Sequence, residues 1–393
     1  MNKLTHCPIC GSPTTTRFLR RALVPVHQNL VAKDRSAAVE ITRGDLDLAV
    51  CETCGFVFNQ SFDAAKLTYN QAYDNTQSYS PYFDAYLDDL VEQLVDQRGV
   101  RNQRIVEVGC GKGLFLKKLV GAADTGNTGY GFDPSYAGPD IDLGGRIRFE
   151  RRYYGPDCTH IPADIVVCRH VIEHIADPIQ LLRTIRQTLA DAPHARVFFE
   201  TPCVDWILRN QIIWDFFYEH CSYFSAQSLT TAFEIAGFHV ERVTHIFGEQ
   251  YLWLEATLAA GNPAITKRPN DTPALARRFA IAENQLVSSW RARVAALAAR
   301  QRIALWGAGA KGVTFANLVD ADCTQIACVV DMNPQKQHQY IPGSGHPIID
   351  YRELARLGVS AALVMNPNYR QEIAQLVAQA KLQIELIDAM AME

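Results

Sequence analysis

Apolar and polar positions alternate along the chain in blocks that predict strands and helices in turn. The run RIVEV at 104–108 is a short apolar strand, followed by a glycine-rich turn and an amphipathic helix. Apolar runs at 128–133, 163–171 and 195–202 predict further strands, and helical spacing predicts a helix from Pro178 to Ala190. Strands that alternate with helices favour an α/β fold, a parallel sheet with helices on both faces.

Further elements are predicted on either side of this core. Residues 82–97 have helical spacing, and a helix that begins near Ala226 stops at Gly237. Two β-rich runs, FHVERVTHI and QYLWLEATL, then predict an antiparallel pair at the edge of the sheet. After a proline-rich linker and a long helix, RIALWGAGAKGVTFANLV predicts a second strand–turn–helix unit, and no second mononucleotide half is evident after it.

These elements divide the chain into three units. We expect an N-terminal module over 1–62, an α/β domain over 63–260, a linker and connecting helix over 261–300, and a smaller Rossmann-like α/β domain over 301–393.

Composition and charge narrow the class of protein. Of 393 residues, 48% are hydrophobic and 20% are charged, which is typical of globular domains that bury a core. The formal net charge of -4 argues against binding of nucleic acid or an anionic membrane by bulk charge. Without an apolar run long enough to span a bilayer, or an apolar N-terminal signal, the sequence predicts a cytoplasmic protein.

Two cysteine pairs share the form CxxCG, namely CPICG and CETCG. Each is a tight turn that can direct two thiolates at one metal ion, so the two turns predict a four-sulfur site. A site filled by four thiolates has no open position for water or substrate, which favours a structural zinc over a catalytic one. The alternative is unligated thiols. The ligands would be Cys7, Cys10, Cys51 and Cys54.

The glycine-rich turn after residue 106 is suited to a nucleotide-like ligand. Glycines let the backbone approach a ligand closely, and the start of the following helix presents free N–H groups. The turn EVGCGKG at 107–113 has the form Gly-x-Gly-x-Gly, with an acidic residue two places before the first glycine. This pattern resembles motif I of the class I S-adenosylmethionine (SAM) methyltransferases. The following strand ends at Asp133, where a carboxylate can accept two hydrogen bonds from a ribose diol. CRHVIEHIADP resembles a further run of that family; the alternative is a related domain that binds nothing. The residues of the turn are Glu107, Gly109, Gly111 and Gly113.

The second glycine-rich turn fits the dinucleotide fingerprint. Gly307, Gly309 and Gly312 have its spacing, and Asp331 ends the next strand. NAD is one candidate ligand. Another nucleotide-bearing ligand, or packing alone, fits a unit of this short length better.

The three units in this order resemble the sugar C-methyltransferases, which act on nucleotide-linked 4-keto deoxysugars. The pieces QYIPGSGHPI and NPNYRQEI also match runs of that family. The resemblance implies a small-molecule substrate, SAM as methyl donor and S-adenosylhomocysteine as product. It implies that His220, beside Glu219, removes a proton from carbon next to the ketone, and that the enolate takes the methyl group. A histidine suits that step because its usual pKa is near neutral pH. The neighbouring carboxylate, Glu219, can hold the tautomer of the ring and stabilise the imidazolium.

Other site residues follow from the same resemblance. His174 would lie near the oxygen that gains charge, and Tyr79 and His170 beside the cofactor. The family's tyrosine is replaced by Phe217, which removes a hydroxyl that Tyr218 could supply in its place. Adjacent residues of an extended strand point to opposite faces, which counts against Tyr218 as a substitute for the missing hydroxyl. The identity of the methyl acceptor therefore stays open.

Alternatives to this function remain. The chain could methylate oxygen or nitrogen of another small molecule, or bind NAD at the second turn. The cysteine module could instead be an adaptor that binds nucleic acid or protein. The negative formal net charge of the chain counts against this alternative. We expect a monomer or weak homo-oligomer without a nucleic-acid or membrane partner.

Overall fold

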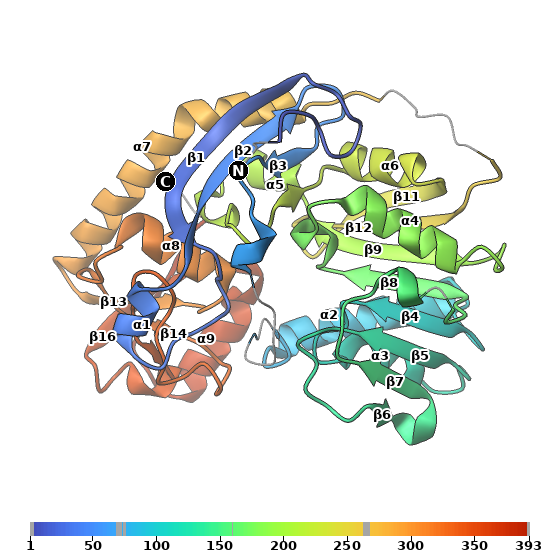
Figure 1. Ribbon diagram of the computed structural model, residues 1–393. Helices are drawn as coiled ribbons and strands as arrows, with labels where there is room; N and C mark the ends of the chain where they lie inside the picture. The colour runs from blue at the N-terminus through green and yellow to red at the C-terminus, as the bar shows by residue number, and fades with distance from the viewer. Residues whose placement is uncertain (1–3, 68–72, 74–75, 159, 262–267, 391–393) are drawn as a thin grey trace.

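The computed structural model describes residues 4–67, 73, 76–158, 160–261 and 268–390. Within these residues the chain forms a four-stranded, an eight-stranded and a five-stranded sheet (Figure 1). No helix in the described ranges is both long and apolar enough to cross a membrane.

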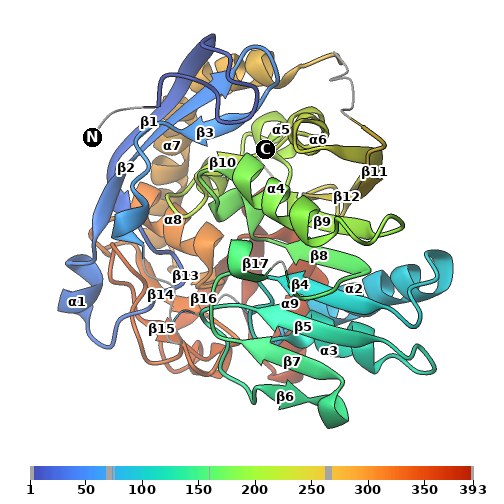
Figure 2. The ribbon, with the colours of Figure 1, turned by 45° about the vertical axis from the view of Figure 1, so that its right-hand side comes forward.

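The first sheet is antiparallel and receives its fourth strand from far along the chain. The N-terminal hairpin β1–β2 pairs through β2 with β3, and β3 pairs with β10 (Figure 2). The run around Glu219 and His220 is therefore a turn between the short helix η6 and β10, and only two of its residues form a strand. The elements are β1 Thr15–Pro25, α1 Arg35–Val39, β2 Arg43–Cys51, β3 Val57–Asn59, η6 Ile213–Asp215 and β10 Ser222–Tyr223.

The second sheet has the order β11-β12-β9-β8-β4-β5-β7-β6. Five neighbouring strands, β7, β5, β4, β8 and β9, are parallel, and β12 joins β9 antiparallel, as the sequence predicts for 238–258. From the central β4 the chain continues to β5 on one side and returns to β8 on the other, so a crevice opens where β4 and β8 end. The strands are β4 Arg104–Val108, β5 Thr128–Phe132, β6 Ile141–Asp142, β7 Ile147–Glu150, β8 Ile165–Arg169, β9 Arg196–Pro202, β11 Phe238–Ile246 and β12 Tyr251–Leu258.

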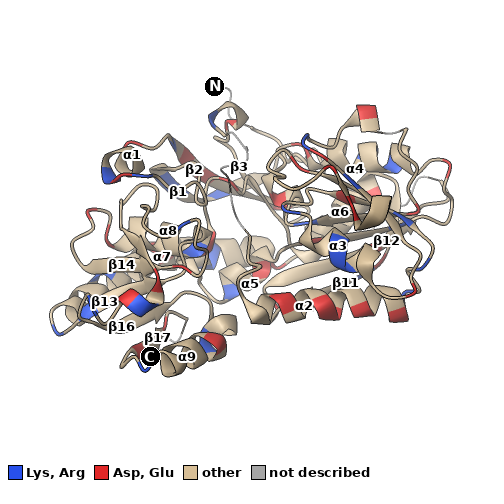
Figure 3. Cartoon of the chain, turned by 90° about the horizontal axis from the view of Figure 1, so that it is seen from below, with Lys and Arg blue, Asp and Glu red and all other residues tan. Residues whose placement is uncertain are grey.

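Helices cover both faces of this sheet, as predicted. The apolar sides of α2 and α3 pack in one core, and those of α4 and α6 in another. Local chemistry sets the ends: Pro178 opens α4 behind the capping carboxylate of Asp177, and Ser225 and Ser228 form a capping box on α6. Acidic residues recur along α2 (Figure 3). The helices are α2 Pro81–Glu92, continued by η2 Gln93–Gln97, α3 Leu114–Gly121, α4 Pro178–Thr188, α5 Val204–Arg209 and α6 Ala226–Ile235.

The third sheet is parallel throughout, in the order β15-β14-β13-β16-β17. Strands β16 and β17 lie on the side of β13 opposite β14, so a partial second half is present that the sequence did not reveal. Helix α7 lies along the first sheet and shares a core with it and with the third sheet (Figure 1). The elements are α7 Thr272–Ala298, β13 Arg302–Trp306, α8 Ala310–Val319, β14 Ile326–Val330, β15 Ile348–Ile349, β16 Val359–Val364, α9 Arg370–Gln379 and β17 Glu385–Asp388.

Candidate active site

One cavity of about 770 Å³ is lined by all three parts of the chain. The glycine-rich turn after β4 forms part of its wall, and the turn after β13 forms another part. Asn29, from the segment between β1 and β2, also lines it. A ligand in this cavity can therefore touch both glycine-rich turns at once.

The turn after β4 has the backbone that its glycines permit. Gly109 and Gly113 have φ values of 70° and 78°, and a Cβ at Gly109 would lie 2.1 Å from a methyl group of Val171. Gly111 also has a positive φ, of 54°, but a Cβ there would meet no protein atom within 4 Å. The open space at Gly111 lets a ligand lie directly against the backbone.

Asp133 directly follows β5, beside this turn. Its Oδ2 accepts a hydrogen bond from Gly111 N at 2.8 Å, and its Oδ1 accepts from both Ser135 N and Ser135 Oγ at 2.7 Å. The carboxylate lines the cavity and keeps acceptor capacity on Oδ2 for a ligand hydroxyl. Asp133 therefore both orders the turn and suits a ribose.

Glu107 is buried behind the same turn, with 3% of its surface exposed. It accepts a hydrogen bond from Leu116 N at 3.2 Å. Burial raises its pKa to about 8, although the nearby Arg169 guanidinium opposes the rise. This carboxyl group thus anchors the first turn of α3 and also reaches the cavity wall.

A buried ion network joins β8 to β9. Glu200 bonds to Arg169 Nε at 2.6 Å, to His170 Nε2 at 2.9 Å, and to the Tyr86 hydroxyl at 2.7 Å. Burial favours the neutral acid, but Arg169 and His170 outweigh it and lower the pKa of Glu200 to about 2. Burial alone would lower the pKa of His170, but the carboxylates of Glu200 and Glu173 outweigh this effect and raise the pKa to about 9. His170 and the partly exposed Tyr79 both line the cavity.

His220 lies in the same cavity, next to His174. The two rings meet edge to face with centroids 4.7 Å apart, and the ring of Phe217 lies 4.2 Å from that of His220. One donor atom from each of Glu173, His174 and His220 lies within 4.8 Å of the others. Burial lowers the pKa of His220 well below its usual value, and His174, His170 and Lys311 add to this. His220 is therefore neutral at neutral pH.

Glu219 does not bond to its neighbour. It accepts hydrogen bonds from Gln28 N at 3.1 Å and pairs with His27 Nδ1 at 3.2 Å, so the segment after β1 holds it in place. Tyr73 also lies beside this group, and burial raises its pKa well above the usual value. No sequence motif marked His27 or Gln28, because the contact joins segments 191 and 192 positions apart in the chain.

Tyr218 is not among the residues that line the cavity. It is fully buried, and its hydroxyl accepts a hydrogen bond from Asp63 N at 2.8 Å while its ring packs against Phe62. Phe217, in contrast, faces the cavity beside His220. The hydroxyl of Tyr218 therefore holds the segment that follows β3 and does not replace the one missing at Phe217.

The second turn meets side chains from outside its own domain. Asp331 accepts from Ala308 N at 2.9 Å and from Asn333 N at 2.8 Å, in the same manner as Asp133 in the first turn. The buried Lys336 Nζ donates to Asn29 Oδ1 at 3.2 Å. Lys311 pairs with Asp215 of η6, and both line the cavity. Two lysines and a glycine-rich turn make this wall suitable for an anionic ligand.

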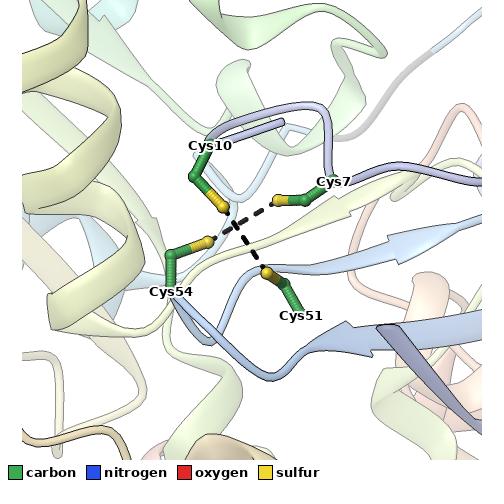
Figure 4. A group of neighbouring side chains, drawn as sticks. All are labelled: Cys7, Cys10, Cys51 and Cys54. Atoms are coloured by element: carbon green, nitrogen blue, oxygen red, sulfur yellow. Dashed lines mark hydrogen bonds between the residues drawn. The ribbon is translucent and has the colours of Figure 1, made fainter. Parts of the chain in front are cut away.

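The four predicted cysteine ligands meet in one cluster (Figure 4). Cys7 and Cys54 sulfurs lie 3.6 Å apart, as do those of Cys10 and Cys51. A tetrahedral site with Zn–S bonds of about 2.3 Å has sulfurs about 3.8 Å apart. These thiols are free, and the spacing fits four ligands of one zinc ion rather than disulfides.

Comparison with known proteins finds two family models in the chain. Residues 79–243 match a model described as a methyltransferase domain, and residues 271–384 match a C-methyltransferase C-terminal domain. The C-methyltransferase NovU of Streptomyces niveus is 25% identical over 94% of this chain and 91% of its own length. A ubiquinone biosynthesis O-methyltransferase of Yersinia enterocolitica is 26% identical over 30% of this chain and 47% of its own.

Solved methyltransferases resemble part of the fold. A SAM-dependent methyltransferase from Mesorhizobium loti has 19% identity and a TM-score of 0.34, over 44% of this chain and 99% of its own. A Burkholderia thailandensis 1,6-didemethyltoxoflavin-N1-methyltransferase has 14% identity and a TM-score of 0.36, over 46% and 82%. Because these scores are low, the family models and the relative that spans the chain carry the assignment.

The chain is a SAM-dependent methyltransferase. Its glycine-rich turn, its sheet order and the matched domain agree on this class. More narrowly, the chain combines a methyltransferase domain with a C-methyltransferase C-terminal domain, behind a cysteine-rich N-terminal segment, and it is similar to a C-methyltransferase over 94% of its length.

Proposed function

We propose that the protein transfers a methyl group from SAM to a carbon atom of a nucleotide-linked 4-keto deoxysugar. The observation that carries this proposal is the shared cavity. One wall is the SAM-type turn, another is the C-terminal turn with Lys311 and Lys336, and His220 also lines it. A nucleotide-sugar suits the cavity because its diphosphate can meet the lysines while the sugar reaches His220.

His220 is the proposed base. In its neutral form it accepts a proton from the carbon next to the ketone, and the C–H electron pair remains on the acceptor as an enolate. When bound, SAM would supply an electrophilic methyl group to the enolate carbon, and S-adenosylhomocysteine, which keeps the electron pair of the broken S–CH3 bond, would be the leaving group. The lowered pKa of His220 keeps the ring unprotonated before the step, so no prior proton loss is needed.

The neighbouring residues have positioning roles in this proposal. The ring of His174 lies beside that of His220, with centroids 4.7 Å apart. An acceptor held at His220 can therefore place its ketone oxygen near a ring N–H of His174, which would stabilise the negative charge that develops on that oxygen. Glu219, held by His27 and Gln28, fixes the backbone next to the base. Tyr218 is left without a catalytic role, because its hydroxyl binds Asp63 outside the cavity lining.

The cofactor site and the metal site complete the proposal. The turn from Glu107 to Gly113 and Asp133 would hold SAM, with Tyr79 and His170 on the same cavity wall. The four cysteines would hold one structural zinc ion. We also propose a cytoplasmic monomer or weak homo-oligomer, with the chain divided at 1–62, 63–260, 261–300 and 301–393. Each of the three larger units has its own sheet, although β10 crosses into the first.

The decisive experiment uses SAM with a labelled methyl group and a panel of nucleotide-linked 4-keto sugars. We expect a labelled product whose methyl group is on carbon, identified by mass spectrometry and proton NMR. His220→Ala should abolish turnover and leave the SAM dissociation constant within about twofold, because the side chain serves the proton step. His239→Ala, at an exposed position on β11, is the matched control.

A methyl group on oxygen or nitrogen of the product would instead favour an O- or N-methyltransferase. Activity of His220→Ala within a few-fold of wild type would exclude His220 as the base.

A further inference from the structure

The proposed base lacks the carboxylate partner expected beside it. Glu219 bonds to His27 and Gln28, and the ring of His220 contacts the rings of Phe217, His174 and Tyr223. A histidine that takes a proton inside a pocket becomes a cation, and a cation removed from water needs a counter-charge. Another group must supply that charge.

Glu173 has the position for this role, and it also pairs with His170. A carboxylate oxygen of Glu173 lies within 4.8 Å of ring nitrogens of both His174 and His220. The residue is 1% exposed, and its Oε2 accepts a hydrogen bond from Thr201 at 3.1 Å. Its buried Oε1 makes no hydrogen bond to a described residue and lies 3.4 Å from His170 Nδ1. Thr201 of β9 thus fixes one oxygen, and the other faces a ring nitrogen of His170.

We infer that Glu173 is the positioning carboxylate of the His174–His220 pair and the counter-charge of the imidazolium formed during proton transfer. The inference rests on the proposed function, because it needs His220 to act as the base. The proton moves from the acceptor carbon to a His220 nitrogen, and the electron pair stays on the acceptor. Glu173 takes no proton in this step and acts as a carboxylate that orients a catalytic histidine does.

The charges around the pair explain why a carboxylate is needed. His170 at the end of β8 and Lys311 on α8 face His220, and Lys311 is itself paired with Asp215. Burial, His174, His170 and Lys311 all lower the pKa of His220, so each opposes the imidazolium. Glu173 offsets them, because a nearby negative charge favours the protonated ring. Cys221 and Tyr223, also close by, are neutral at neutral pH because burial raises the pKa of each.

The test measures the histidines directly. The NMR titration of histidine ring signals is recorded for the protein saturated with S-adenosylhomocysteine, with assignments from His174→Gln and His220→Gln. In Glu173→Gln the apparent pKa of the pair should fall, because removal of a negative charge disfavours the protonated ring. Glu173→Asp should keep it near wild type. The control is Glu92→Gln, the same charge change at an exposed position on α2.

A second measurement follows the proton step without methyl transfer. Thymidine- or uridine-diphosphate 4-keto-6-deoxyglucose is incubated in D₂O with S-adenosylhomocysteine and enzyme, and deuterium entry at the carbon next to the ketone is measured. Glu173→Gln should slow the exchange on the order of 10- to 100-fold, less than the loss of a triad carboxylate bonded to its histidine. The dissociation constant of S-adenosylhomocysteine should stay within about twofold.

The outcomes separate the two proposals. If wild type exchanges deuterium and Glu173→Gln does so at the same rate or with unchanged histidine pKa values, Glu173 has no such role and the proposed function stands. If wild type itself does not exchange, the enolate mechanism fails and the role of Glu173 fails with it. A slower exchange accompanied by a lower pKa in Glu173→Gln, but not in Glu173→Asp, supports both.

Discussion

His170 has two buried carboxylates on opposite sides of its ring. Nε2 lies 2.9 Å from Glu200, and Nδ1 lies 3.4 Å from Glu173. The backbone of His170 has a φ of 53°, in the left-handed region that few residues other than glycine and asparagine adopt. These contacts hold the ring as an imidazolium at neutral pH, and its pKa is raised from 6.5 to about 9.

This raised pKa predicts a loss of stability at alkaline pH. Because the folded chain holds the proton more tightly than the unfolded chain, the contribution of His170 is fully present below about pH 6.5 and is lost as the pH rises through about 9. Glu107, whose pKa is raised to about 8, also holds its proton more tightly in the folded chain. Its contribution to stability therefore also falls as the pH rises to about 8. The free energy of unfolding in urea should therefore fall from pH 6.5 to 9 by more in wild type than in His170→Asn.

His170→Asn is a suitable comparison because asparagine tolerates the left-handed backbone. An equal fall in both proteins would show that His170 does not carry a raised pKa.

Strand β10 connects the cysteine module to the candidate active site. It pairs with β3, and Cys221 C=O accepts a hydrogen bond from Asn59 N at 3.0 Å. The turn that carries Glu219 and His220 lies directly before β10. The sheet closed by the four cysteines therefore positions this turn, and a metal ion there would act on catalysis through the fold.

Removal of the metal should test that connection. Cys51→Ser should lose the zinc ion and lower the melting temperature by more than about 5 °C, because metal binding at a closed site contributes directly to folding. Metal analysis of the purified protein and thermal unfolding measure the two effects. Cys323→Ser, at a partly exposed cysteine outside the cluster, should change neither. Equal metal content in wild type and Cys51→Ser would refute the zinc site.

The three parts of the molecule are tied together around the cavity. Asn29 reaches the C-terminal turn through Lys336, and Asp215 of the segment before His220 pairs with Lys311 of α8. Lys311 also lies 5.5 Å above the ring of Trp206. The C-terminal domain therefore contacts the segment that carries the proposed base. Under the proposed function, this contact would couple acceptor binding to the position of the base.

Lys311→Met should reveal this coupling. Loss of the lysine leaves Asp215 as a largely buried carboxylate without its partner, which should lower the free energy of unfolding by about 1–2 kcal/mol. The double variant Lys311→Met with Asp215→Asn should recover most of that loss, since no charge is then left unpaired. Urea unfolding of the four proteins gives the interaction energy. Strictly additive effects would show that the pair does not connect the domains.

Local patterns in the sequence were sufficient to predict many of the turns and helices of this protein. The glycine-rich turns, the CxxCG pairs and the amphipathic helices depend on neighbouring residues, and the structure has them where the sequence predicts them. The matched methyltransferase domain confirms the class of enzyme that the first turn indicated.

Only the tertiary structure decided which side chains share the cavity. The sequence could not reveal that Glu219 bonds to His27, that Tyr218 turns to Asp63, or that Glu173 faces His220. Nor could it show that β10 completes the first sheet and β17 the third. Each of these contacts joins segments far apart in the chain, and their pairing is set by burial and side-chain direction in the folded core. A one-dimensional pattern does not encode these.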